Sequence, residues 1–319
     1  MKIGIPRALL YYWYGGIWEQ FWQKCDQTVI ISPFTDHGIL KAGIEVAVDE
    51  LCLPVKIFLG HVRSLEPMVD LIMIPHLNKV ERDAYICPKF MGLPDVVSHA
   101  VPSVKDKMMV VKVGPRDTSM MKGLEHSAAN YGIGVAKKKF TRPGWLFKSK
   151  NLQDSQIPPE NPAQNILTAY VKKFGKAESN LTIGLLGHPY CLYDSFFNHN
   201  LLSLLANNNI KFLTPEMIPS SYRGIGSGLL NKSLFWTMGR FQFDALEWML
   251  HGEPVNGFIL VTPFACGPEA IVGNLLERRI KQAGKPVLQL NFEEHSGEAG
   301  IITRLEAFLD LIKYRHKVC

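Results

Sequence analysis

The chain has 319 residues, of which 47% are hydrophobic and 20% are charged, and its formal net charge is +6. This length allows two domains, or one large domain with an ample core. No apolar stretch is long enough to cross a bilayer and the first residues do not resemble a signal peptide, so we expect a soluble, cytoplasmic protein with no membrane partner. The positive charge favours anionic partners. The lysine run 137–139 has no interleaved aromatic residues, however, and we expect no nucleic acid partner.

In chain order, short apolar runs alternate with segments of helical periodicity. Strands are predicted at 2–6, 28–31, 69–75, 107–113, 181–186, 210–213, 258–261 and 286–290. Helices are predicted at 8–24, 39–51, 119–131, 195–207, 235–251, 270–283 and 300–313. This alternation predicts an α/β fold made of two Rossmann-like, doubly wound lobes whose parallel sheets face a cleft.

The division between the lobes is predicted from a stretch rich in proline and polar residues. Pro158, Pro159 and Pro162 stand among Asn, Gln and Ser, a composition typical of a linker. We therefore predict an amino-terminal α/β lobe at 1–150, a linker at 151–165 and a carboxy-terminal α/β lobe at 166–319.

The cysteines are too few and too scattered for a disulfide scaffold, at positions 25, 52, 87, 191, 266 and 319. Cys25 shares fourfold spacing with Ile17 and Phe21, which places it on the core face of a helix. Cys266 lies between an apolar run and Pro268, which fits the start of a helix. A helix start would favour a thiolate there, for a bound anion or a metal, although an ordinary half-buried cysteine is the alternative.

Four cysteines fall where a parallel sheet binds ligands, beyond the carboxyl ends of its strands. Cys87, Cys191 and Cys266 each follow a predicted strand, and Cys52 opens the connection to the next one. If the lobes face each other, these four thiols converge. Prolines follow three of them closely, a feature of iron–sulfur ligands and also of ordinary turns. The chain has no Cys-x-x-Cys spacing, so neither a zinc ribbon nor the usual ferredoxin motif is present.

Other motifs are weaker. Pro54 argues against a simple continuation of the helix predicted at 39–51. The glycine-rich segment 224–228 does not directly follow a strand, and we interpret it as a mobile loop and not as a phosphate-binding loop. His188 shares a loop with Cys191, so a redox enzyme with Cys191 as nucleophile is a further hypothesis.

Several separate motifs resemble, in order, an uncharacterised family that occurs alone or fused to ATP-dependent activases in the 2-hydroxyacyl-CoA dehydratase group of anaerobes. They lie at 2–12, 48–56, 87–95, 187–190, 263–268 and 297–300. The resemblance covers nearly the whole chain. It implies an oxygen-sensitive [4Fe-4S] cluster between two Rossmann-like lobes, held by Cys52, Cys87 and Cys266, with one iron open to a substrate. Cys191 stands where many relatives have another residue and is a tentative fourth ligand, which would close that iron.

With this resemblance, the sequence predicts an iron–sulfur protein that transfers low-potential electrons or reductively activates a small or CoA-linked substrate. Lys56, Lys89 and the helix start at Pro268 would offset the charge of the cluster. An ATP-dependent activase or another redox protein is the expected partner. If the chain is an enzyme, it is a dehydratase-like lyase or a reductase, and its catalytic residues are not identified. The alternative is a zinc-bound or metal-free scaffold for an activase or an acyl-CoA partner.

Overall fold

The computed structural model describes residues 1–81, 83–114, 119–135, 162, 165–167, 181–230 and 232–318. The chain divides into two compact units. The first comprises Met1–Gln164 and Phe235–Thr237, and the second comprises Asn165–Leu234 and Met238–Cys319. The predicted linker, 151–165, lies almost entirely outside the described residues. Each unit contains one four-stranded sheet with all strands parallel, which confirms the predicted α/β class with two Rossmann-like lobes.

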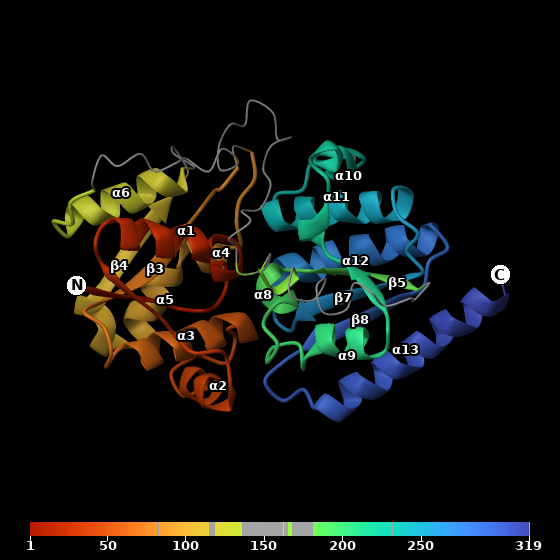
Figure 1. Ribbon diagram of the computed structural model, residues 1–319, viewed down its shortest axis with the longest axis horizontal. Coiled ribbons are helices and arrows are strands. Elements are labelled where there is room, and N and C mark those ends of the chain that lie inside the picture. Colours follow the sequence, from red (N-terminus) through yellow and green to blue (C-terminus); the bar gives the residue numbers. More distant parts are fainter. Residues whose placement is uncertain are drawn as a thin grey trace. The chain divides into compact units, whose positions relative to one another are not determined.

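The sheet of the first unit has the strand order β2-β1-β3-β4. Its strands are β1 (Lys2–Ile5), β2 (Thr28–Ile31), β3 (Leu71–Leu77) and β4 (Met108–Val113). The main helices are α1 (Tyr11–Lys24), α2 (His37–Ile44), α3 (Leu53–Leu65), α5 (Leu93–Ala100) and α6 (Met120–Asn130). Figure 1 shows α1 and α6 on one face of this sheet and α3 and α5 on the other. The strands therefore lie inside a three-layer arrangement.

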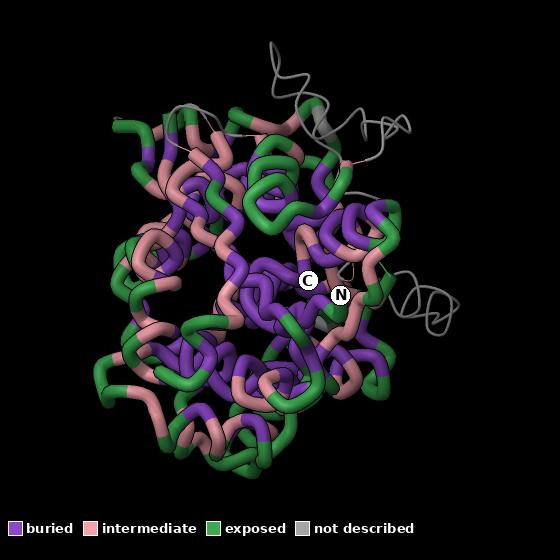
Figure 2. Tube along the Cα trace, turned by 90° about the vertical axis from the view of Figure 1, so that its left-hand side faces the viewer, coloured by how far each residue is buried: buried purple, intermediate pink, exposed green. Residues whose placement is uncertain are grey.

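The central strands are apolar along nearly their whole length because helices cover both of their faces. Ile72, Met73 and Ile74 of β3 are at most 1% exposed, as is typical of parallel strands in doubly wound folds. Figure 2 marks the buried stretches of the chain in purple, among them residues 71–75 of β3.

The region of α2 and α3 differs from the sequence prediction. The helix expected at 39–51 ends at Ile44 as α2, and a second helix, α3, begins directly after Cys52. Pro54 lies in the first turn of α3, where the backbone N–H that proline lacks has no intrahelical partner in any case. Pro54 therefore lies in the first turn of a new helix and does not end helical structure in this region.

The second unit repeats the same topology with the strand order β6-β5-β7-β8. Its strands are β5 (Thr182–Gly187), β6 (Lys211–Leu213), β7 (Gly257–Pro263) and β8 (Val287–Phe292). Its main helices are α9 (Leu201–Asn207), α11 (Thr237–His251), α12 (Gly267–Gln282) and α13 (Glu298–Val318). In Figure 1, α11 and α12 cover one face of the sheet and α9 and α13 the other.

Short helical turns occupy several connections. They are α4 (Pro88–Met91), α8 (Pro189–Leu192), α10 (Ile225–Gly228) and 3₁₀ turns at Pro102–Lys107, Pro215–Met217 and Ser220–Tyr222. The segment 224–228, predicted as a loop, thus contains a helical turn. Among the described helices, none is long and apolar enough to span a membrane.

The strand order places a ligand-binding position in each unit. β1 lies between β2 and β3, and β5 lies between β6 and β7. The connections that leave β1 and β3, or β5 and β7, therefore run to opposite faces of the sheet. In such folds the carboxyl ends of these two strands border the usual ligand crevice.

Candidate functional site

The segment between β3 and Cys87 folds back on itself, so that Cys87 lies near the carboxyl end of β3. Asn78 directly follows β3, and its carbonyl accepts a hydrogen bond from the Ile86 N–H at 3.1 Å. Cys87 then precedes Pro88, the first residue of α4, and takes the capping position of that helix. The thiol therefore lies at the carboxyl edge of the sheet, as the sequence predicted.

Cys52 occupies the capping position of α3 in the same unit. Its carbonyl accepts the Val55 N–H at 2.9 Å, and its side chain is buried. Lys89, in α4, donates from Nζ to the carbonyl of Glu50 at 2.9 Å. This bond links the start of α4 to the segment just before Cys52, and so joins the two cysteine-bearing turns.

The surroundings of the two thiols shift the pKa of each in the same direction. Burial raises the pKa of Cys52 and of Cys87, and the neighbouring Cys52 raises the pKa of Cys87 further. The charge of Lys89 acts in the opposite direction on both thiols, and Lys56 does so on Cys52. Without a cation between them both groups stay protonated at neutral pH. A bound metal would offset the cost of ionising the two thiols and release the protons.

Cys266 lies in the second unit, in the tight turn between β7 and α12. Ala265 has a φ of +60°, a left-handed conformation that is rare for a residue with a side chain. Cys266 follows in the capping position of α12, its N–H donates to the Pro263 carbonyl at 3.3 Å, and its side chain is buried. The strand-to-helix turn predicted from the sequence is therefore present. Backbone strain of this kind is concentrated at functional sites.

A cluster of buried polar side chains lies at the same edge of the second sheet. His188 directly follows β5, and its Nε2 lies 2.9 Å from Oε2 of Glu269, in the first turn of α12. The Tyr190 hydroxyl lies 2.6 Å from Nδ1 of the same ring. Gln242 of α11 donates from Nε2 to Glu269 at 3.2 Å. All four side chains are buried.

This network fixes the histidine ring. Glu269 engages Nε2 and the Tyr190 hydroxyl engages Nδ1, so both ring nitrogens have a partner and the ring is held in one orientation. Gln242 Oε1 is buried and has no hydrogen-bond partner among the described residues. An unsatisfied buried acceptor costs about 1–3 kcal/mol, so this arrangement is not explained by stability alone.

Sequence analysis missed Glu269 and Gln242 as members of a site. His188 and Glu269 are 81 positions apart, and no spacing rule joins them. The available signal was topological: both residues follow strands that the sheet order makes neighbours, β5 and β7.

Two other cysteines have different environments. Cys191 is 0% exposed within α8. Both nitrogens of His188 are engaged by Glu269 and Tyr190, which weighs against His188 as a base for a Cys191 nucleophile. Cys25 ends α1 and is buried, in line with its predicted core position.

The described residues hold no group of three or more His, Cys, Asp or Glu side chains arranged to bind a metal ion. Cys52 and Cys87 come together in the first unit, and Cys191 and Cys266 belong to the second. Ligation by these cysteines therefore stays a prediction.

A family model described as CoA enzyme activase uncharacterised domain (DUF2229) matches residues 2–218. The α/β fold with paired thiols at helix starts thus belongs to a class related to the activases of CoA enzymes. Because the match covers more than half of the chain, the protein is a member of this family. The suspected relationship is confirmed. A search of curated proteins found no match.

Proposed function

We propose that this chain is an iron–sulfur protein in which Cys52, Cys87 and Cys266 hold a [4Fe-4S] cluster. The observation that carries the proposal is that Cys52 and Cys87 each directly precede a helix in two turns that the hydrogen bond from Lys89 to the Glu50 carbonyl links. Membership in a CoA enzyme activase family supports it.

The donor set fits such a group chemically. Thiolates are the usual ligands of iron–sulfur clusters, and helix N-termini together with nearby lysines compensate negative charge. Cys266 has the same kind of position as the other two, directly before a helix that begins with Gly267 and Pro268. A bound cluster would supply low-potential one-electron chemistry. The protein's own residues would bind it, offset its charge and exclude water from it.

The proposal includes a physiological role. The cluster would pass electrons, or reductively activate a small or CoA-linked substrate. An ATP-dependent activase or another redox protein is the proposed electron donor. The proposed compartment is the cytoplasm, where thiols stay reduced.

A zinc-bound or metal-free scaffold is the second candidate. The observation that favours it is that the turns of Cys52 and Cys87 are linked within the first unit, where they can serve a structural role without a ligand from the second unit. In this case the paired thiols would be structural, and the protein would dock an activase or an acyl-CoA partner.

Metal content separates the two candidates. We expect anaerobically purified protein to be brown and to contain iron and acid-labile sulfide. Cys52→Ser, Cys87→Ser and Cys266→Ser should each lose most of the iron, because each removes a ligand. Cys25→Ser is the matched control, since Cys25 is buried like Cys52 and Cys266 but lies at the end of α1. Cys191→Ser tests the tentative fourth ligand.

Stoichiometric zinc with no visible absorption would favour the scaffold. A colourless protein that takes up neither iron nor zinc on anaerobic reconstitution would remove the cluster proposal and leave the metal-free scaffold. Equal iron loss in the Cys25→Ser control would show that the variants act through folding.

A further inference from the structure

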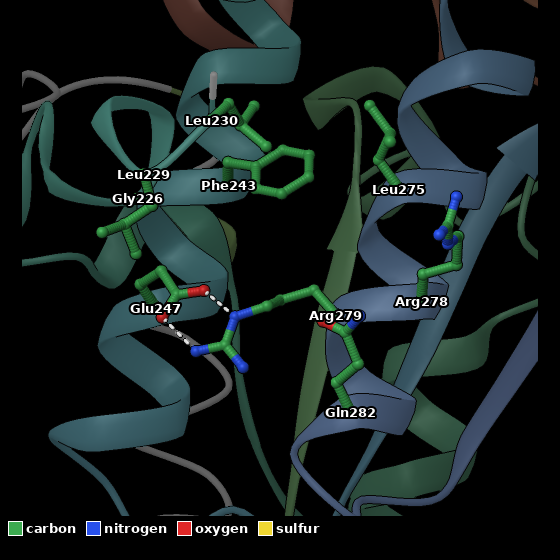
Figure 3. Close-up of a pocket in the computed structure, with 9 residues that line it drawn as sticks. All are labelled: Gly226, Leu229, Leu230, Phe243, Glu247, Leu275, Arg278, Arg279 and Gln282. Atoms are coloured by element: carbon green, nitrogen blue, oxygen red, sulfur yellow. Dashed lines mark hydrogen bonds and ion pairs between the residues drawn. The ribbon is translucent and has the colours of Figure 1, made fainter. Parts of the chain in front are cut away.

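A cavity of about 430 Å³ lies in the second unit, between α10, α11 and α12. Its size falls in the range of about 300–1,000 Å³ typical of small-molecule sites. Figure 3 shows its lining residues. None of them belongs to the buried polar cluster or neighbours a cysteine in sequence, so the cavity is a separate feature of the fold.

Four of the nine residues that line the cavity are Leu or Phe and form the apolar part of its wall. Phe243 of α11 and Leu275 of α12 lie on its two sides, and Leu229 and Leu230 follow α10. Leu229 is 64% exposed. Leu229 therefore extends the apolar lining of the cavity to its open edge.

The segment that carries the leucines is held in place by α11. Asp244 accepts hydrogen bonds from the N–H groups of Gly224 at 2.7 Å and Ser227 at 2.8 Å. A Cβ at Gly226 would lie 2.2 Å from the Phe243 carbonyl, so glycine is required for this close approach. The wall is therefore docked on α11 by backbone contacts, where the sequence predicted a mobile loop.

One side of the cavity is closed by a charge pair. Arg279 of α12 donates to Glu247 of α11 through Nε at 2.6 Å and a terminal nitrogen at 2.8 Å. Figure 3 shows this side chain crossing between the two helices below Phe243 and Leu275. Because the carboxylate of Glu247 is matched in a two-bond geometry, it adds little net negative charge.

Arg278 is the third charged side chain that lines the cavity, beside Glu247 and Arg279. It is exposed, and in the described part of the chain no carboxylate pairs with it. Its neighbour Glu277 pairs with Lys281 at 2.7 Å. The cavity thus combines a partly apolar wall with a guanidinium that lacks a counter-ion, and guanidinium groups bind carboxylates with two parallel hydrogen bonds.

We propose that this cavity binds an aliphatic carboxylate, with its chain against Leu230, Phe243 and Leu275 and its carboxylate on Arg278. The site is independent of the proposed cluster, and needs neither metal nor activase.

Binding of octanoate to the full chain, measured by isothermal titration calorimetry, tests this proposal. Arg278→Gln should weaken octanoate binding about tenfold, the effect of losing one charge-assisted contact. The variant should leave the binding of 1-octanol, which has the same chain and no charge, unchanged. Lys281→Gln is the matched control, because it removes another exposed positive charge of α12 that does not line the cavity. It should bind octanoate like the wild type. Leu275→Trp, which fills the cavity, should abolish the binding of both ligands.

The proposal would be overturned if the wild-type protein gives no heat with millimolar octanoate. Unchanged binding by Arg278→Gln, or an equal loss in Lys281→Gln, would also overturn it. Circular dichroism of each variant confirms that differences in binding do not come from unfolding.

Discussion

His61 is a buried ionisable group whose state depends on folding. It lies on α3 with no exposed surface, and its Nε2 is 3.1 Å from the Thr35 hydroxyl. Within the described residues Nδ1 has no hydrogen-bond partner. Burial, together with the charge of Arg7, lowers the pKa of His61 to about 3. The imidazole is therefore neutral in the folded protein at every pH where the protein is handled.

This lowered pKa predicts a loss of stability in mild acid. Between pH 6.5 and pH 3 the unfolded chain binds a proton at His61 and the folded chain does not. The free energy of unfolding should thus fall by about 1.4 kcal/mol for each pH unit below 6.5. Urea unfolding at pH 7.5, 6.0 and 5.0 measures this slope. His61→Leu should flatten it, whereas His99→Gln, at an exposed position, should not. A slope that is the same in all three proteins would contradict the assignment.

The cysteines at helix starts and the buried polar cluster around His188 were not equally predictable from single residues. Cys266 was predicted at a helix start because Pro268 follows it within two residues. Cys52 and Cys87 were not, because Pro54 was interpreted as a barrier and no helix was predicted after Cys87. The contact between His188 and Glu269 depends on which strands are neighbours. That order is a property of the whole sheet and leaves no local pattern in the sequence.

At the scale of elements, α2 and α3 pack with their backbones in direct contact. A Cβ at Gly43 would lie 1.9 Å from the carbonyl oxygen of Lys56, and one at Gly60 would lie 1.9 Å from that of Ile39. The two glycines are required on facing helices. This contact also fixes α3, the helix that begins after Cys52.

Gly60→Ala should therefore destabilise the first unit. Alanine favours a helix over glycine by about 1 kcal/mol, but overpacking costs typically 1–3 kcal/mol, and a backbone carbonyl cannot turn aside as a side chain can. We expect a net loss of about 1–2 kcal/mol in urea unfolding. Gly134→Ala is the control, because nothing lies within 4 Å of a Cβ there. Equal stability of Gly60→Ala and the wild type would show that the helices can separate without cost.

The strands were predicted more closely than the helices. β2 has the predicted bounds because its apolar run is short and β-branched. The helix predicted at 39–51 was wrong because apolar periodicity continues through a turn, and the proline that starts α3 was interpreted as a barrier. Periodicity identifies buried faces, but it does not show where a chain turns between two helices that share a face.

At the scale of the whole molecule, the two units have equivalent strand orders, β2-β1-β3-β4 and β6-β5-β7-β8. β3 and β7 hold the same place in their sheets. Cys87 is carried back to the end of β3, and Cys266 follows β7 in the same topological position. The two cysteines are therefore equivalent in fold, although the sequences around them differ in length and composition.

The family match ends at residue 218, inside the second unit. Residues 1–218 keep β5 and β6 but lose β7, all of whose residues are buried, and β8. They also lose Glu269, the partner of His188. The loss of Phe235 and Thr237, which each form a backbone hydrogen bond of 2.9 Å with Tyr85, removes two hydrogen bonds from the first unit as well.

A protein ending at residue 218 should therefore fold only in part. β5 would expose Leu185 and Leu186 where β7 and the helices that follow β6 had covered the sheet, and two strands alone are at most marginally stable in water. Limited proteolysis followed by mass spectrometry should degrade the region after residue 181 and leave a fragment that contains β1 to β4. The full-length chain under the same conditions should keep β5 protected. If the shortened protein protects β5 and β6 as well as the full chain does, the second sheet does not depend on β7, and the matched segment is a folding unit of its own.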